Sequence, residues 1–198
     1  MESGRLEAFS DGVLAIIITI MVLEFKAPHS PELAALRPLA PVALSYLLSF
    51  VYVGIYWNNH HHMLYATHRI DGQVLWANLH LLFWLSLVPF VTGWMGENHF
   101  APVPTAAYGV VLLMAAVAYT ILQRIIVATQ PAESILRDVL SHDVKGMLSL
   151  LIYVAAIPVA LMRPWMAGVM YSVVALIWVA PDRRIERALM AEGRPTRG

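Results

Sequence analysis

Hydrophobic residues run along this chain in six long stretches that are separated by short polar segments. Each stretch is close to the roughly 20 residues that an α-helix needs to cross a bilayer. The stretches fall at about 6–25, 39–59, 73–95, 103–127, 144–162 and 164–181. The pattern therefore predicts an all-α polytopic membrane protein with six transmembrane helices in a domain spanning residues 1–182. A short basic cytoplasmic tail, residues 183–198, is predicted to follow it.

Prolines refine this prediction at two points. Pro89 and Pro158 lie inside predicted spans, where a proline removes a backbone donor and is expected to kink the helix. The fifth and sixth stretches are short, and only residues 162–165 separate them. The six-helix prediction divides them into two spans at this point.

The composition agrees with a membrane protein and excludes several classes of function. Hydrophobic residues make up 59% of the chain, charged residues only 13%, and the mean hydropathy is +0.65. The formal net charge of zero gives no indication of a nucleic-acid partner. The absence of cysteine excludes disulfides, thiolate nucleophiles and cysteine metal sites.

Basic residues predict the orientation in the membrane. With both termini in the cytoplasm, ten of the thirteen lysines and arginines fall on the inner side: Arg5, Arg69, Arg124, Arg137, Lys145, Arg183, Arg184, Arg187, Arg194 and Arg197. Only Lys26, Arg37 and Arg163 fall on the outer side. This distribution follows the positive-inside rule. Together with the short loops, it predicts a multi-pass protein of a prokaryotic plasma membrane.

The first stretch combines ionisable residues with a very apolar helix. Ionisable groups at membrane depth are costly and usually mark a functional path. At about 100° per residue, one helical stripe collects Phe9, Gly12, Ile16, Ile20 and Leu23, with Thr19 at its shoulder. Ser10 and Asp11 fall on other faces. From the pattern alone, the stripe fits a surface that faces lipid or the protein core.

Asp11 requires hydrogen-bond donors, because a carboxylate does not face lipid. The candidates in the next two stretches are Trp57, Asn58, His60, Asn78 and His80. Tryptophan and asparagine donate to a carboxylate, and histidine can donate or become charged. A buried network that clamps three helices together is the favoured interpretation, and a proton relay is the alternative.

The order of residues in this first stretch resembles a known signature. Arg5-x-x-x-Phe9-Ser10-Asp11, followed by Gly12-Val13-x-Ala15-Ile16 and Thr19, is similar to the signature of the transmembrane protein 175 family of potassium channels. The chain length and the six stretches agree with the short prokaryotic, single-repeat members of that family. The resemblance covers essentially the whole chain, although beyond the first three stretches it is one of architecture rather than of motif.

The resemblance implies a homotetramer in which the first helix of each subunit lines a central pore. Rings of large apolar side chains, here Ile16, Ile20 and Leu23, would form the constriction, with the Thr19 hydroxyl beside them. The signature residues would belong to a structural polar network with the second and third helices. Its members would be Arg5, Phe9, Ser10, Asp11, Trp57, Asn58, Asn78 and His80.

The implied function is passive conduction of potassium through a membrane channel, with other monovalent cations passing less well. Apolar constrictions gate by dewetting, and they discriminate by the cost of removing water from the ion. Potassium loses its hydration shell more easily than sodium, so a narrow apolar ring can prefer it. The prediction is a non-enzymatic channel without a cofactor or metal, in which potassium is the permeant ion.

Two other functions are alternatives to a channel. The run His60-His61-His62, with His68 nearby, could belong to a membrane metal or haem protein. However, consecutive helical side chains point about 100° apart, so the three cannot all bind one ion, and an interfacial cluster is favoured. The second alternative is a proton-coupled transporter centred on Asp11 and His80. The sequence shows no internal repeat, which weighs against a transporter.

Overall fold

The computed structural model describes residues 3–65, 67, 70–129 and 144–179, and in this part of the chain all regular structure is helical. The elements are α1 (Ser3–Leu23), the 3-10 helix η1 (Leu33–Leu39), α2 (Ala40–Tyr65), α3 (Gly72–Ser86), α4 (Val88–Glu97), α5 (Pro102–Thr129), α7 (Val144–Met162) and α8 (Pro164–Val179). The predicted all-α class is therefore confirmed. The predicted tail 183–198 lies outside the described residues.

Five of the six predicted stretches are long and apolar enough to cross a membrane. They are Gly4–Leu23, Leu33–Leu64, Gly72–Glu97, Pro102–Ala128 and Val144–Met162. The sixth stretch corresponds to α8, an apolar helix of 16 residues that reaches the edge of the described part of the chain.

The third stretch consists of two helices rather than one. Pro89 is at the start of α4 and has no backbone N–H to continue the ladder from α3. The chain turns at Leu87, whose N–H donates to the carbonyl of Trp84 at 3.2 Å. The expected effect of Pro89 is thus seen as a helix break. In contrast, α7 continues through Pro158 to Met162.

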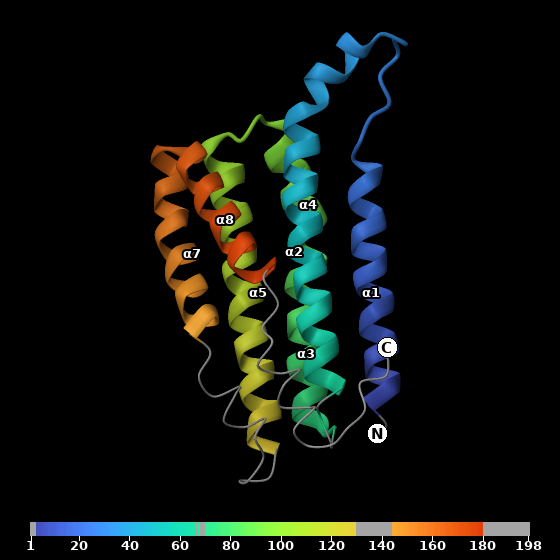
Figure 1. Cartoon of the computed structure of the whole chain (residues 1–198), viewed down its shortest axis with the longest axis vertical. Helices are drawn as coiled ribbons and strands as arrows, with labels where there is room; N and C mark the ends of the chain where they lie inside the picture. The colour runs from blue at the N-terminus through green and yellow to red at the C-terminus, as the bar shows by residue number, and fades with distance from the viewer. Residues whose placement is uncertain (1–2, 66, 68–69, 130–143, 180–198) are drawn as a thin grey trace.

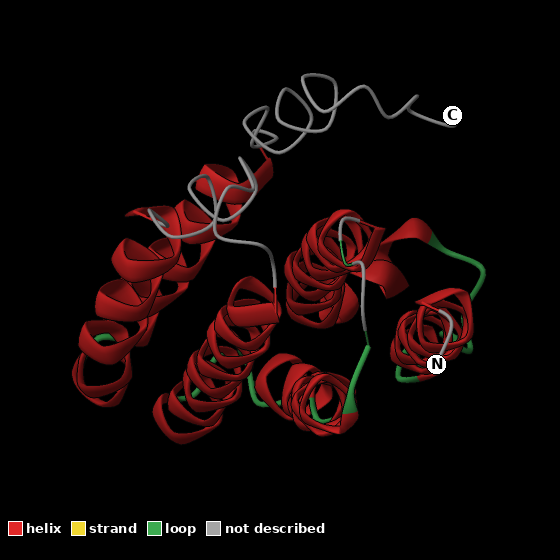
Figure 2. Cartoon of the chain, turned by 90° about the horizontal axis from the view of Figure 1, so that it is seen from below, coloured by secondary structure: helices red, strands yellow, loops and turns green. Residues whose placement is uncertain are grey.

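The helices run side by side along one direction and form a single bundle (Figure 1). At one edge lies α1, which packs against α2, α3 and α4. The pair α7–α8 lies at the other edge, where α7 packs on α5 and α8 contacts α2, α5 and α7 (Figure 2). The amino-terminal end of the bundle is the lower end in Figure 1, where the described parts of α2 and α5 also end.

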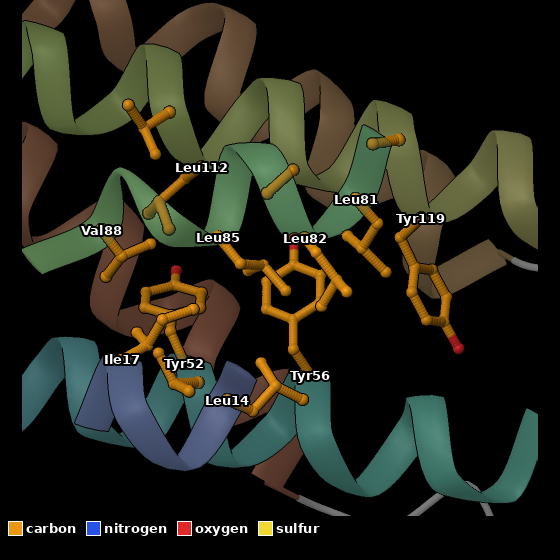
Figure 3. Packing of buried hydrophobic residues seen from close by; sticks show 14 of the residues in the cluster. Leu14, Ile17, Tyr52, Tyr56, Leu81, Leu82, Leu85, Val88, Leu112 and Tyr119 are labelled. Atoms are coloured by element: carbon orange, nitrogen blue, oxygen red, sulfur yellow. The ribbon is translucent and has the colours of Figure 1, made fainter. Parts of the chain in front are cut away.

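Side chains fill the centre of this bundle. Leu14 and Ile17 of α1 meet Leu85 of α3 and the tyrosines of α2 in a continuous buried cluster (Figure 3). Buried hydroxyls inside it are bonded to one another or to carbonyls. Ser49 lies 2.6 Å from Thr92 and 3.0 Å from Tyr108, both between hydroxyl oxygens. A filled centre leaves the outer faces of the bundle as the place to look for an ion path.

Gly96 permits the close approach of α4 to α2, and its replacement is expected to separate them. A Cβ at this position would lie 2.9 Å from the Cα of Val42 and would also collide with Ser45 Oγ. Overpacking of this kind costs about 1–3 kcal/mol. We therefore expect Gly96→Ala to lower the melting temperature of the purified protein in detergent. Gly54→Ala is the matched control, because its Cβ would meet nothing within 4 Å; equal melting temperatures for the two variants would contradict the packing argument.

Candidate functional site

The helix α1 has one face packed into its own subunit and one that is exposed. Leu6, Ser10, Leu14, Ile17 and Met21 are buried, and their spacing of three or four residues places them on one side. The sequence-derived stripe lies on the other side. The exposed fractions there are 52% for Phe9, 57% for Ile16, 42% for Ile20 and 79% for Leu23, and Gly12 and Thr19 are also exposed. The helix thus presents a largely apolar surface that no other described part of the subunit covers.

Ser10 connects α1 to α2 and α3 through a chain of buried hydrogen bonds. The Asn78 Nδ2 donates to Ser10 Oγ at 3.0 Å, and Ser10 Oγ donates to the carbonyl of Leu6 at 2.9 Å. Asn78 Oδ1 lies 2.6 Å from His60 Nε2. Because Oδ1 can only accept, His60 Nε2 must be the donor. Ser10, Asn78 and His60 are all at most 1% exposed, so the chain joins three helices in the protein interior.

A second set of contacts joins acidic residues of α1 to aromatic residues of α2. The Trp57 Nε1 donates to Asp11 Oδ1 at 3.1 Å. One helical turn away, His61 Nδ1 lies 2.6 Å from Glu7 Oε1. Trp57 and His61 also stack, with ring centroids 6.2 Å apart. Glu7 and Asp11, like Trp57 and His61, are four residues apart, so each pair lies on one helix face.

The structure places some predicted network members elsewhere. His80 accepts from Trp84 Nε1 at 3.0 Å within α3, and it therefore is not the partner of Ser10 or Asp11. The histidine in this network is instead His60, through its bond to Asn78. Asn58 makes no side-chain hydrogen bond to the described residues, and Arg5 and Phe9 are exposed rather than buried in the network. The Glu7–His61 contact was not predicted, although the four-residue spacing of two acids opposite two aromatic donors is a signal for it.

Polar contacts also hold the segment that follows α1 at the opposite end of the bundle. Lys26 Nζ lies 2.9 Å from Glu97 Oε1 at the end of α4. The hydrogen bond to Glu97 and the charge of that carboxylate raise the pKa of Lys26 above its ordinary value. Glu24 packs its carboxylate against Gly93, one turn earlier on α4, at 3.2 Å from the position of a Cβ. These contacts place the side chains of Lys26 and Glu24 against α4.

On the exposed stripe, Thr19 has the one hydroxyl. Its Oγ1 donates to the carbonyl of Ile16 at 2.9 Å. The donor is therefore used within the helix, and the two lone pairs of the oxygen are available to accept. A cation that passed the stripe would meet one acceptor between large apolar side chains, without any fixed charge.

The histidines give no metal site in the part of the chain that the structure describes. No group of three histidine, aspartate or glutamate side chains there has an arrangement that could hold a metal ion. His60 is bonded to Asn78 and His61 to Glu7, so these two point to different partners. His68, the fourth residue of the proposed cluster, lies outside the described residues.

Comparison with known proteins identifies similar chains. Residues 5–89 match the family described as "TMEM175: Endosomal/lysosomal potassium channel TMEM175". A protein of Chryseobacterium sp. (strain P1-3) named as a potassium channel is 52% identical over 189 residues, which cover 96% of this chain and 98% of the relative. A potassium channel of Streptomyces collinus is 36% identical over 126 residues, 60% of this chain and 61% of that protein.

A solved structure shows the same arrangement of helices. It is the crystal structure of a lysosomal potassium-selective channel TMEM175 homolog from Chamaesiphon minutus. The two structures match with a TM-score of 0.79 and 28% sequence identity, over 90% of this chain and 96% of the other. The fold of this chain is therefore that of a channel structure along nearly its whole length.

Proposed function

Because this chain belongs to the TMEM175 family, we propose that it forms a potassium-preferring cation channel whose pore lies between copies of α1. Four subunits would surround a central path, and potassium would move passively down its electrochemical gradient. Both termini would lie in the cytoplasm, and the protein would reside in the plasma membrane of a prokaryote.

The observation that supports this proposal most is the exposed stripe on α1. The interior of the subunit is filled by buried side chains such as Tyr108, Leu112 and Leu122, so a continuous ion path has no room there. The stripe, in contrast, is an apolar surface with a hydroxyl at its shoulder on a helix at the edge of the bundle. Copies of this surface around an axis would make a narrow, mostly apolar lumen.

In this channel, Ile16, Ile20 and Leu23 would form successive rings, and Thr19 would lie between them. Such rings close a pore by dewetting, and they admit an ion only when part of its water is removed. The Thr19 oxygen would replace some of that water. Since potassium is dehydrated more easily than sodium, the rings would give a modest preference for potassium.

The polar contacts of α1 would fix which face of the helix turns toward the axis. Ser10 and Asp11 hold α1 to α2 and α3 near one end of the bundle. Lys26, just beyond the helix, is held to α4 at the other end. With both ends fixed to its own subunit, the helix cannot rotate the stripe away without breaking these contacts.

Recordings of ion currents and a count of the subunits together test the proposal. Purified protein in planar bilayers is expected to give currents whose reversal potential, in opposing potassium and sodium solutions, indicates potassium preference. Native mass spectrometry is expected to show four copies. A monomeric species that conducts would contradict the shared pore. Saturable flux that follows an imposed proton gradient would instead identify a transporter.

A further inference from the structure

A small, partly open cavity lies between helices of the subunit, away from α1. Its volume is about 40 Å³, and α2, α5, α7 and α8 line it. The residues that form most of its wall include Tyr56, Asn59, Ala116, Tyr119, Ser149 and Trp178. Tyr56 and Tyr119 meet edge to face there, with centroids 6.0 Å apart (Figure 3). This cavity has no part in the proposed pore.

The wall of the cavity is carbon, because the polar groups around it are bonded elsewhere. The Asn59 side chain donates to the carbonyl of Ile55 at 2.8 Å, and Thr120 donates to that of Ala116 at 2.8 Å. Ser149 Oγ accepts from Trp178 Nε1 at 2.8 Å. Apolar cavities of this kind stay dry and accept apolar ligands. A hydrocarbon fits this surface better than water or an ion does.

The helix α8 forms one part of the cavity wall. Of the pair α7–α8, it is α8 that packs on α2, and it contributes Trp178 to the cavity wall. Beyond the wall residues, α2 and α5 continue toward the amino-terminal end of the bundle (Figure 1). On α2 the wall runs from Tyr52 to Asn59, about 10 Å along the helix. The apolar surface is therefore a groove parallel to the helices, at membrane depth.

Two cations lie at the amino-terminal end of this groove. Arg124 is exposed and follows Thr120 by one turn on the same face of α5. Lys145 is next to Gly146, a wall residue near the start of α7. Basic residues beside an apolar groove at a membrane surface favour anionic lipid headgroups.

We propose that the groove holds the end of one acyl chain of an anionic phospholipid, with its phosphate beside Arg124 and Lys145. Lipid chains surround this part of the protein, and the cavity volume fits the end of a chain rather than a whole molecule. The orientation proposed above places this lipid in the cytoplasmic leaflet. The contacts themselves depend neither on that orientation nor on the pore, so loss of channel activity would leave this proposal standing.

Native mass spectrometry with added lipid tests the chain contact. We expect wild-type protein to retain one phosphatidylglycerol for each subunit. Ala116→Leu fills the groove and should weaken this binding roughly tenfold, as expected when about two methylenes lose their site. Val110→Leu is the matched control, since Val110 is 41% exposed on α5 and lies outside the cavity wall. Equal binding by wild type and Ala116→Leu would overturn the proposal; if Ala116→Leu does not fold, the smaller Ala116→Val gives the same comparison.

Two further variants test the headgroup contact and the tail, residues 180–198, as the alternative occupant of the groove. Arg124→Gln should lower the preference for phosphatidylglycerol over phosphatidylcholine, and an unchanged preference would overturn the headgroup assignment. Residues 180–198 follow Trp178 closely and are the other candidate occupant. If lipid binds in the groove only after residues 180–198 are deleted, the tail is the native occupant and the lipid proposal is wrong. If the deletion leaves lipid binding unchanged, the lipid proposal is supported.

Discussion

Replacing Ile20 or Leu23 by alanine is expected to raise the single-channel conductance several-fold and to reduce the preference for potassium over sodium. Both side chains lie on the exposed stripe of α1, with exposed fractions of 42% and 79%. Shortening either one widens the proposed ring, so an ion keeps more of its water as it passes. The difference in dehydration cost between potassium and sodium then falls. Reversal potentials in planar bilayers measure this change directly.

Val22→Ala is the control for these variants. Val22 is exposed at 47% on the same helix, but at 100° per residue it points about 120° away from Ile16, off the stripe. Its truncation should leave conductance and selectivity as they are in the wild type. If Ile20→Ala and Leu23→Ala both leave the currents unchanged, the pore does not follow this stripe. If only Val22→Ala changes them, a different face of α1 lines the path.

The architecture could be predicted from the sequence because membrane-spanning helices depend on local composition. Apolar stretches of span length, bounded by polar residues, predicted the all-α bundle, and the structure confirms it. The break between α3 and α4 could be located near Pro89 for the same reason, since the missing donor acts within one turn.

The partners of the polar residues could be predicted only as a set of candidates. Helical periodicity places Ser10 on a different face from Ile16, and the buried Ser10 and exposed Ile16 agree with that. However, the choice of His60 rather than His80 depends on how far α2 and α3 are shifted along their axes. That shift is set by packing between helices, such as the approach at Gly96, which no local pattern contains. The pore role of the stripe stays a prediction that the recordings above decide.

Asn78→Ala is expected to destabilise the subunit more than any other single change in the polar network. Asn78 is fully buried and links the other two members of the hydrogen-bond network. It donates to Ser10 and accepts from His60. Its truncation leaves the His60 N–H buried without an acceptor, which costs about 1–3 kcal/mol. Ser10 keeps its bond to the Leu6 carbonyl and loses only a donor. The melting temperature in detergent and the yield of folded protein should both fall.

Ser172→Ala is the control for this prediction, and a double-mutant cycle of Ser10 and Asn78 is the measurement that decides it. Ser172 is exposed and bonds only within its own helix, to the carbonyl of Gly168 at 2.8 Å, so its removal should change stability little. In the cycle, Ser10→Ala combined with Asn78→Ala should cost less than the sum of the two single changes, because each already removes their shared bond. Coupling energies between membrane helices average about 0.6 kcal/mol. Strictly additive costs would show that this bond does not hold α1 to α3, and the orientation of the stripe would then need another cause.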